Sequence, residues 1–273
     1  MTKRTIQHVP TKWQAFIWFL ALLIIPFAYV FRNGIESYLY DKSQCAEPRR
    51  RQWKSYSIPI SPGYSVHGLD ISHYQCDIDW EEVKKMNENG IRIQFAFIRA
   101  TRGFTTLDYK FNDNWKGAKS VGILRGAYHF YFFNQDPIQQ AQFFLKNVSV
   151  KTGDLPPVLD IEFDEKTDDK LLPKDQILRG IATWLTYVEQ ETGVKPIIYT
   201  NLDYYKRYIN GIFPDYKIWI ANYNNPRGVK LPDGKEWSFW QMSSKVRCNG
   251  ISELADFNVF NGSRMDLEKL LKK

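Results

Sequence analysis

From residue 66 onward, short apolar runs alternate with stretches whose apolar residues recur at helical spacing. Eight of the runs have the length and the β-branched or aromatic content of strands. They are Val66–Ile71, Ile93–Ala100, Ile123–Phe132, Pro157–Phe163, Ile197–Thr200, Ile218–Ala221, Trp237–Gln241 and Ala255–Phe260. Strands that alternate with helices predict a parallel sheet, and eight such strands predict that the sheet closes into a barrel.

Helices are predicted between the early strands, with Asp or Pro at their starts and Gly at their ends. They are a helix from Asp79 to Gly90, one over Asn112–Ser120, one that begins at Asp136-Pro137, and one over Pro173–Thr192. The spacers between the last strands are too short for full helices. We therefore expect an irregular barrel of the α/β class.

A different pattern occupies the N-terminus. Residues 13–31 contain no charge, and a tryptophan or tyrosine lies near each end of the run. A helix of about 20 apolar residues spans the hydrocarbon core of a membrane, so we predict a transmembrane signal anchor. A buried core helix is disfavoured because it normally keeps a polar face. A cleaved signal peptide is disfavoured because the run is long and no small-residue cleavage site follows it.

The anchor divides the chain into four predicted parts. They are a basic tail (1–12), the anchor (13–31), a linker without sustained periodicity (32–65) and a globular domain (66–273). Lys and Arg flank the anchor on both sides, and a cluster, Arg49 to Arg51, lies in the linker. The flanking charges are therefore nearly balanced and do not fix the orientation of the anchor.

Composition and charge exclude several classes of protein. The chain is 44% hydrophobic and 16% aromatic, unlike a disordered, collagen-like or small disulfide-rich protein. Its formal net charge is +7, but residues 55–273 carry 28 basic and 27 acidic residues, so the globular part is almost neutral. We expect no nucleic-acid partner. Three cysteines without CxxC spacing and four scattered histidines predict no metal site, and we expect no cofactor.

The candidate chemistry begins with Asp160 and Glu162, in an otherwise apolar run. Residues i and i+2 of a strand share a face, and their Cα atoms lie about 6.6 Å apart at a rise of about 3.3 Å per residue. Like charges this close raise the pKa of one of the two groups, so one carboxyl stays protonated while the other ionises. Glycosidic cleavage uses that division of roles. The alternative is an exposed acidic strand end that only aids solubility.

Two further acidic residues join this pair if the barrel closes. Asp70 ends the first predicted strand and Asp256 lies in the last, and these strands are neighbours in a closed barrel. Carboxylates from several strands would then meet at one mouth. Aromatic residues occur near the same strand ends as these acidic residues, and aromatic faces beside carboxylates suit a sugar chain. Core packing is the alternative explanation for many of them. They are Tyr128, Tyr131, Trp219, Tyr223 and Trp240.

These residues lie in a series of motifs that resembles the family 25 glycoside hydrolases, the N-acetylmuramidase lysozymes. The opening motif D-x-S-x-x-Q is present as Asp70 to Gln75. Similar segments follow in the family's order: Phe97–Thr101, Gly126–Tyr131, Pro157–Glu162, Pro196–Thr200, Trp219–Tyr223, Trp240-Gln241 and Asp256–Asn258. Each motif is weak by itself, but eight in order span nearly the whole globular part.

The resemblance implies a barrel of five β/α units followed by three strands. It also implies cleavage of the β-1,4 bond between N-acetylmuramic acid and N-acetylglucosamine in peptidoglycan. Carried over, Glu162 is the general acid and Asp160 steadies the acetamido group of the substrate, while Asp70 and Asp256 line the site. We expect Tyr199 and Gln241 to bind substrate together with the aromatic residues named above.

Two other functions stay open at this point. A membrane-tethered barrel could bind glycan without cleaving it, although both Asp160 and Glu162 are kept. A related barrel could act on chitin-like chains, but the upstream acids of D-x-x-D-x-D-x-E are absent before Asp160. Whichever function holds, we expect the chain to be a monomer. Because peptidoglycan is external, we expect a single-pass membrane protein with its barrel outside the cytoplasm and a lipid bilayer around residues 13–31.

The same geometry predicts a disulfide. Cys76 follows the first strand closely and Cys248 precedes the last, so both loops are expected at one barrel mouth. A bridge needs Cα atoms about 4.4–6.8 Å apart, and an extracytoplasmic compartment permits oxidation. We therefore expect a Cys76–Cys248 bridge with Cys45 free; the alternative is three reduced thiols.

Overall fold

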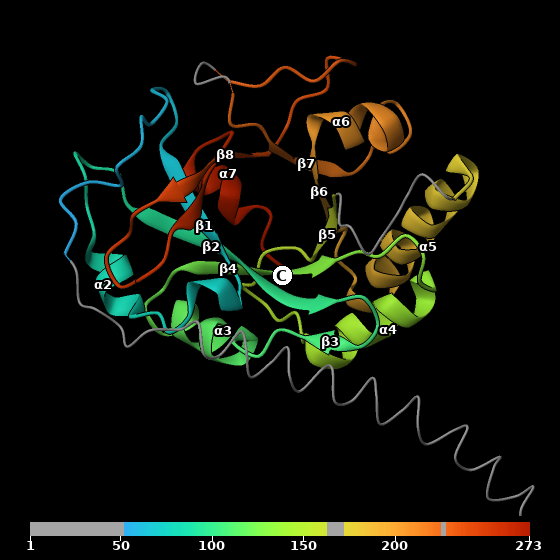
Figure 1. Ribbon diagram of the computed structural model, residues 1–273, viewed down its shortest axis with the longest axis horizontal. Helices are drawn as coiled ribbons and strands as arrows, with labels where there is room; N and C mark the ends of the chain where they lie inside the picture. The colour runs from blue at the N-terminus through green and yellow to red at the C-terminus, as the bar shows by residue number, and fades with distance from the viewer. Residues whose placement is uncertain (1–51, 163–171, 225–227) are drawn as a thin grey trace, which may run out of the picture. The chain divides into compact units, whose positions relative to one another are not determined.

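The computed structural model describes residues 52–162, 172–224 and 228–273. Its central feature is a sheet in which eight strands close on themselves, because β1 pairs with both β2 and β9 (Figure 1). The barrel strands are β1 (Val66–Ile71), β2 (Ile93–Arg102), β4 (Leu124–Phe130), β5 (Val158–Ile161), β6 (Ile197–Asn201), β7 (Lys217–Ala221), β8 (Phe239–Val246) and β9 (Ala255–Phe260). The predicted closed α/β barrel is confirmed.

One of the eight barrel strands runs against the other seven. Pairs from β1 through β8 are parallel, whereas β9 is antiparallel to both of its neighbours, β8 and β1. The segment that leads into β9 therefore reaches the same mouth as the segments that follow the other strands. A short strand, β3 (Thr106–Leu107), extends β2 as a hairpin and was not predicted from the sequence pattern.

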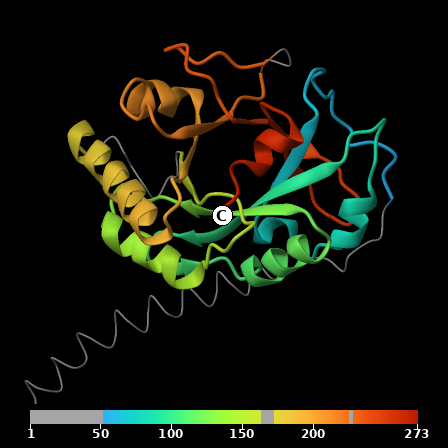
Figure 2. The same cartoon turned by 180° about the vertical axis from the view of Figure 1, so that it is seen from behind.

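Helical segments connect the first six barrel strands, which gives the expected five β/α units and three further strands. They are η1 (His73–Gln75), α2 (Trp80–Lys85), α3 (Phe111–Ser120), α4 (Pro137–Asn147), α5 (Lys174–Thr192), α6 (Leu202–Tyr204) and the π-helical turn η3 (Tyr205–Ile209). A final short helix, α7 (Arg264–Glu268), follows β9. Figures 1 and 2 show α4 and α5 side by side on the outside of the barrel.

Local chemistry explains where these helices begin and end. The Asp79 carboxylate accepts a hydrogen bond from the Glu82 amide (3.2 Å), and Asp136 accepts one from the Gln139 amide (2.8 Å). Both bonds satisfy amides that a helix start leaves without an internal partner. Gly193 ends α5 with φ of 67°, a left-handed conformation that glycine adopts without strain.

Alternation along the strands separates two apolar layers. One cluster fills the barrel, with Phe97 stacked on Trp219 (ring centroids 4.6 Å apart) and beside Phe239 (5.1 Å). A Cβ on Gly126 would lie 2.6 Å from the Phe97 ring, so the absence of a side chain there makes room for it. The second, larger cluster lies between the barrel wall and the surrounding helices.

The segment before β1 packs on the barrel, although it lies within the predicted linker. Tyr56 is fully buried, with its ring 5.3 Å from that of Phe257 on β9, and its amide donates to Glu88 (2.6 Å). The Arg247 guanidinium lies over the Trp53 ring, and the Arg247 amide donates to the Tyr56 carbonyl. The packed domain therefore begins before residue 66.

The predicted basic tail, anchor and first part of the linker, through residue 51, lie outside the described residues. Among the helices of the described ranges, none has the length and hydropathy needed to cross a bilayer.

The expected Cys76–Cys248 bridge is wrong. Cys76 is disulfide-bonded, but Cys248 is a free thiol. Cys248 is fully buried in the outer apolar layer, where burial raises its pKa to about 12. Its side chain thus packs as a core residue rather than facing the loop after β1. The third cysteine, Cys45, lies outside the described residues.

Candidate active site

Asp160 and Glu162 lie at the end of β5. Asp160 is the third residue of the strand, and Glu162 follows one position beyond the strand end. Asp160 is buried, whereas Glu162 is only half-buried. The strand thus fixes one carboxyl inside the barrel mouth and leaves the other nearer to solvent.

Burial raises the pKa of Asp160 well above its ordinary value, and the negative charges of Glu162 and Asp70 raise it further. The positive charges of Arg99 and Arg102 act in the opposite direction. Within the described part of the chain, the Asp160 Oδ1 atom is buried without a hydrogen-bond partner. The group therefore holds a proton at a pH where a solvated carboxyl is ionised.

A second pair of carboxyls comes from the first and last strands. Asp70 and Asp256 are register partners across the antiparallel pair β1–β9, and their side chains are hydrogen-bonded to each other. Burial raises the pKa of Asp70 to about 6 and, with the charge of Asp70, that of Asp256 to about 9. Asp256 is therefore the protonated partner at neutral pH.

Two amide side chains orient Asp70. Gln241 Nε2 donates to Asp70 Oδ2 (2.9 Å), and Asn258 Nδ2 donates to the same oxygen (2.7 Å). These bonds favour the ionised form of Asp70 and limit the rise that burial causes in its pKa. Asn258 in turn accepts a hydrogen bond from the Trp219 indole (2.8 Å).

Two tyrosines extend this network toward the carboxyls of β5. The hydroxyls of Tyr199 (2.8 Å) and Tyr223 (2.5 Å) both donate to Gln241 Oε1. The negative charge of Glu162 contributes to raising the pKa of each hydroxyl, which burial raises most. Tyr199 is buried, whereas the Tyr223 side chain is 51% exposed and presents its ring at the mouth.

The other predicted aromatic residues divide between the site and the outer layer. Tyr128 lies inside the barrel, with its ring edge-on to Trp219 and its hydroxyl in the field of Asp70 and Asp160. Tyr131 and Trp240 belong to the apolar layer outside the barrel. Trp240 alternates with the inward-facing Gln241, so the strand turns its ring away from the mouth.

The Tyr131 ring also points away from the mouth. A Cβ on Gly180 of α5 would lie 2.6 Å from the Tyr131 hydroxyl, which shows that the tyrosine packs under this helix. The structure therefore does not bring Tyr131 or Trp240 to the carboxyl cluster, although sequence analysis placed both there.

Sequence analysis missed an ionic cluster at the mouth. Arg99 on β2 donates from Nε to Asp108 Oδ2 (3.0 Å), and the His73 amide donates to the same oxygen (3.0 Å). The exposed Tyr74 ring lies against His73 at a tilt of 38° (centroids 4.3 Å apart), and the Arg99 guanidinium lies 5.2 Å from the centre of the Tyr74 ring. Arg99 lies in the Phe97–Thr101 motif near the end of a predicted strand, and that position could have marked it as a site residue. No sequence pattern marked Asp108.

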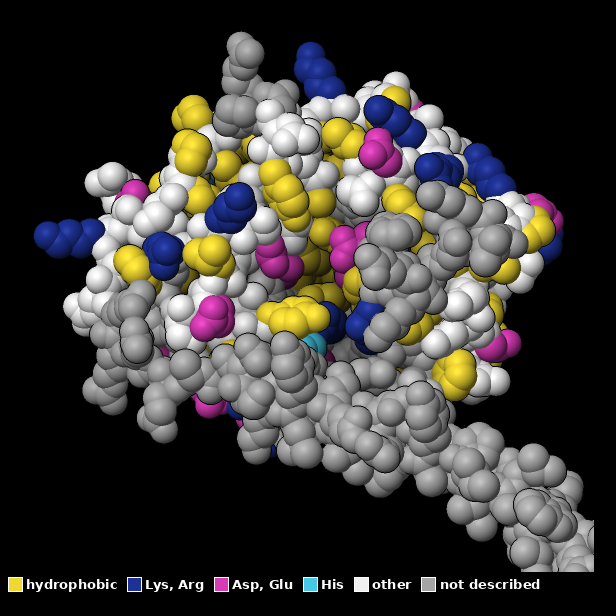
Figure 3. Space-filling model, in the orientation of Figure 1, with side chains coloured by type: hydrophobic (Ala, Val, Ile, Leu, Met, Phe, Trp, Pro, Cys, Tyr) yellow, Lys and Arg dark blue, Asp and Glu magenta, His cyan; other side chains and the backbone are white. Residues whose placement is uncertain are grey.

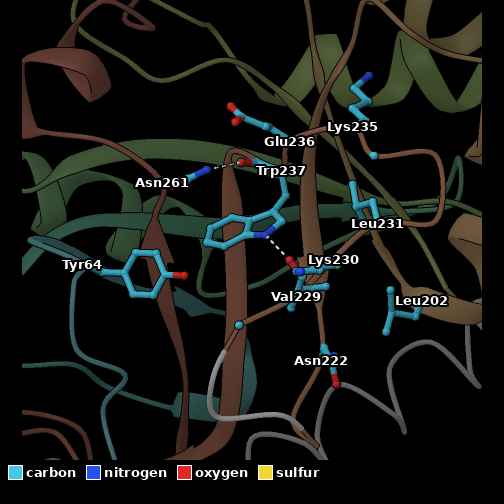
Figure 4. Close-up of a pocket in the computed structure, with 12 residues that line it drawn as sticks. Tyr64, Leu202, Asn222, Val229, Lys230, Leu231, Lys235, Glu236, Trp237 and Asn261 are labelled. Atoms are coloured by element: carbon cyan, nitrogen blue, oxygen red, sulfur yellow. Dashed lines mark hydrogen bonds between the residues drawn. The ribbon is translucent and has the colours of Figure 1, made fainter.

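The surface view places acidic side chains around a central hollow with a hydrophobic floor (Figure 3). A different cavity, of about 790 Å³, lies beside the connection between β7 and β8. In the close-up, Tyr64 and Trp237 stand near each other, the Trp237 indole donates to the Val229 carbonyl, and Asn261 donates to the Trp237 carbonyl (Figure 4). Glu236 is the single carboxyl among its described lining residues, so this cavity is separate from the carboxyl cluster.

The polar groups at the mouth are arranged for proton transfer and not for binding a metal ion. Gln241 and Asn258 turn N–H groups toward Asp70, and hydrogen-bond donors repel a cation. In the described ranges, no group of three or more His, Cys, Asp or Glu residues is arranged to hold a metal ion.

A closed, mostly parallel barrel with paired carboxyls at the strand ends defines a barrel-type glycoside hydrolase. The sequence profile described as "Glycosyl hydrolases family 25" matches residues 69–251. The chain therefore belongs to glycoside hydrolase family 25.

The chain is also similar to individual proteins and solved structures. The protein YegX of Escherichia coli (strain K12) is 42% identical over 218 residues, which cover 80% of this chain and 78% of that protein. Lysozyme M1 of Streptomyces globisporus is 32% identical over 215 residues, covering 72% of this chain and 68% of that protein. A solved family 25 glycosyl hydrolase from Bacillus anthracis superposes with a TM-score of 0.72 at 30% identity, covering 84% of this chain and all of that one.

Proposed function

We propose that this chain is a lysozyme-type glycosidase that hydrolyses β-1,4 bonds between N-acetylmuramic acid and N-acetylglucosamine in peptidoglycan. The observation that carries the proposal is the convergence of Asp160 and Glu162 with the Asp70–Asp256 pair at one mouth of a family 25 barrel. Its similarity to Lysozyme M1 of Streptomyces globisporus supports the same conclusion.

Glu162 is the proton donor in this proposal. It lies just beyond β5, is half-buried, and is therefore the carboxyl of its pair that a glycan in the mouth can reach. A protonated carboxyl there delivers its proton to the glycosidic oxygen as the bond to the sugar breaks. Burial disfavours two negative charges on this pair, so one proton is shared between Asp160 and Glu162, and Glu162 delivers it when a glycan occupies the mouth.

Asp160 also holds the N-acetyl group of the substrate. Its Oδ1 atom, which has no hydrogen-bond partner in the described ranges, is available to the N–H of an acetamido group. Such a bond turns the acetamido oxygen toward the anomeric carbon, where it acts as the internal nucleophile of a substrate-assisted reaction. The ionised Asp70, with Gln241 and Asn258 fixed around it, stabilises the positive charge that develops on the sugar.

Purified peptidoglycan incubated with the full chain tests the activity. We expect soluble fragments and a steady increase in sugar reducing ends, measured colorimetrically. A matched incubation with Glu162→Gln protein shows how much of the increase depends on the site. Intact glycan strands in the wild-type incubation would contradict the proposed function and leave a glycan-binding barrel as the alternative.

We also propose that the barrel acts outside the cytoplasm and that residues 13–31 anchor it. The disulfide at Cys76 supports an oxidising compartment, and the proposed substrate lies outside the cell membrane. A reporter fused to the C-terminus and active only outside the cytoplasm is the expected result. A fusion active only inside the cytoplasm would overturn this topology, whatever the enzymatic activity.

A further inference from the structure

The cavity beside the connection between β7 and β8, here called the wall cavity, lies along the outside of the barrel. Leu202 and Asn222 line one end of it, and each directly follows a strand that ends at the mouth. Tyr64, Trp237 and Asn261 line the other end, where β1 and β8 begin and where the antiparallel β9 ends. The wall cavity therefore extends from the level of the mouth down the side of the barrel.

The wall cavity occupies a place that helices cover elsewhere around the barrel. Helices α3, α4 and α5 pack on the outside of earlier strands, whereas no helix forms in the described part of the connection between β7 and β8. The space that remains is about 790 Å³, within the range of about 300–1,000 Å³ that small-molecule sites occupy. The irregular end of the barrel thus leaves room for a ligand on its wall.

Two aromatic rings stand side by side in the lining of the wall cavity (Figure 4). The ring centroids of Tyr64 and Trp237 lie 5.6 Å apart, and the Trp240 ring packs behind both, at 6.1 and 5.9 Å. The Trp237 indole is fixed by its hydrogen bond to the Val229 carbonyl (2.8 Å). The half-buried Tyr64 has an apolar face and a polar hydroxyl, which match the apolar face and the hydroxyl edge of a sugar ring.

Neutral polar groups with unused hydrogen-bonding capacity surround these rings. Asn222 Oδ1 accepts from the Asn224 amide (3.1 Å), and Asn261 Nδ2 donates to the Trp237 carbonyl (3.2 Å). Among the described residues, Asn222 Nδ2, Asn261 Oδ1 and the Tyr64 hydroxyl have no hydrogen-bond partner. They offer a donor, an acceptor and a group that does both, which is the set that sugar hydroxyl and acetamido groups use.

The charges around the wall cavity nearly cancel, which disfavours an ionic ligand. Lys235 Nζ donates to three backbone carbonyls at 2.7–3.0 Å, so its hydrogen atoms are already used. The two other charged residues of the described lining, Lys230 and Glu236, are exposed and opposite in sign. A polar, uncharged ligand with apolar faces fits this lining best, and a sugar chain is such a ligand.

Asn222 connects the wall cavity to the active site. Its amide donates to the Gln241 carbonyl (3.1 Å), and its own carbonyl accepts from the Trp240 indole (2.8 Å). The next residue, Tyr223, presents its exposed ring at the mouth and donates to Gln241 Oε1. A sugar chain that leaves the mouth past Tyr223 therefore meets the wall cavity directly.

We propose that the wall cavity is a second glycan-binding site, which holds sugars of the substrate strand that lie beyond the cleaved bond. This inference rests on the proposed function, because the strand that it binds is the polymeric substrate of the active site. The enzyme then cleaves long strands more efficiently than short ones, and the residues of the wall cavity set that preference.

The kinetic test compares two substrates that carry no peptides: long glycan strands and a tetrasaccharide obtained from them. The quantity measured is the ratio of kcat/KM on the strands to kcat/KM on the tetrasaccharide. Tyr64→Phe removes the hydroxyl and keeps the ring, and Asn261→Ala removes the exposed amide. Because each change removes about one hydrogen bond to the strand, we expect the double variant to lower the ratio about tenfold, mainly through KM.

Binding without turnover provides a second measurement. In full-length protein that carries Glu162→Gln, adding Tyr64→Phe and Asn261→Ala should raise the Kd for long soluble strands about tenfold. Tyr187→Phe is the matched control, because it removes a half-buried hydroxyl from α5, outside the wall cavity. It should change neither the kinetic ratio nor the Kd, and thermal melts check that each variant folds.

The outcomes separate this inference from the proposed function. A double variant with the wild-type ratio, or with an unchanged Kd in the Glu162→Gln protein, would overturn the second glycan site and leave the glycosidase intact. Failure of the wild-type enzyme to cleave either substrate would overturn the proposed function, and the Kd comparison would still decide whether the wall cavity binds glycan. If the double variant does not fold, Asn261→Ala alone, at an exposed position, decides the question.

Discussion

Asp70 and Asp256 face each other across the antiparallel pair β1–β9 and share a hydrogen bond between their carboxyl groups. This contact exists because β9 runs against the other strands and carries Asp256 to the mouth where β1 delivers Asp70. One residue of the pair ionises near pH 6, while the other keeps its proton to about pH 9. At neutral pH the pair therefore holds one proton. The two carboxyls titrate as a coupled pair and not as two independent acids.

The retained proton has a predicted effect on stability. Both pKa values are raised above those of an unfolded chain, so the folded state binds protons that the unfolded state releases between about pH 4 and pH 9. These groups therefore cost stability as the pH rises through that window. Asp256→Asn, which keeps a donor for Asp70 but cannot ionise, should melt at a higher temperature than wild type at pH 8.5, with the difference shrinking toward pH 5.

Thermal melts of the two proteins across this pH range provide the measurement. Asp215→Asn serves as the control, because Asp215 is exposed on the surface. A melting-temperature difference between wild type and Asp256→Asn that does not change with pH would show that Asp256 is not a buried, raised-pKa acid.

Glu162→Gln should abolish hydrolysis while keeping the fold. The amide has nearly the shape of the carboxyl but cannot donate a proton to a leaving oxygen, and general acid catalysis contributes roughly 10²–10⁴-fold. The release of reducing ends measures turnover, and a thermal melt checks folding. Wild-type turnover by this variant would remove Glu162 from the role of proton donor.

Asp160→Asn should reduce turnover by a factor similar to that of Glu162→Gln for a different reason. The variant keeps an oxygen acceptor but cannot carry the carboxylate charge that orients and stabilises the acetamido group, so it should distinguish less between N-acetylated and de-N-acetylated glycan. Wild-type enzyme should be a poor catalyst on the de-N-acetylated chains. Rates measured on both substrates check this, and efficient cleavage of de-N-acetylated glycan by the wild type argues against a substrate nucleophile.

A buried histidine should govern the acid sensitivity of the fold. His67 on β1 is 3% exposed, neither ring nitrogen has a hydrogen-bond partner in the described ranges, and burial lowers its pKa to about 4. An unfolded chain protonates this ring at about pH 6.5, so stability is lost as the pH falls from there to about 4, by up to about 3 kcal/mol. His67→Leu should lose less stability than wild type over this window.

Urea unfolding at pH 7 and pH 4.5 measures that difference. The buried His129, whose pKa burial lowers to about 3, remains in both proteins and contributes equally to each. Equal losses of unfolding free energy in wild type and His67→Leu would exclude His67 as the cause.

The periodic part of the sequence was sufficient to predict the barrel. Val66–Ile71 and Ala255–Phe260 were located to the residue, because strands with both faces buried are apolar runs bounded by polar turns. Closure of these two strands then follows from their number, and it brought Asp70 and Asp256 together as expected. The hairpin strand β3 has two exposed residues, so no hydrophobic pattern indicated it.

Side-chain direction was the part that sequence reasoning handled poorly. Trp240 and Gln241 are adjacent, and only one of them can face the barrel interior; the structure turns Gln241 inward and Trp240 outward. The same alternation applied from Asp256 would have found Asn258, which bonds to Asp70. The predicted Cys76–Cys248 bridge was wrong for a related reason. The loop that carries Cys248 lies near the mouth, but its thiol packs in the core.

The identity of the new reducing end tests the central claim most directly. Peptidoglycan digested by the full chain is reduced with borohydride, and the fragments are analysed by mass spectrometry, with Glu162→Gln protein as the control. A muramidase leaves N-acetylmuramic acid at the reducing end, so we predict fragments that end in reduced muramic acid, present with wild type and absent with the variant. Fragments that end in reduced glucosamine, or equal yields from both proteins, would contradict the account.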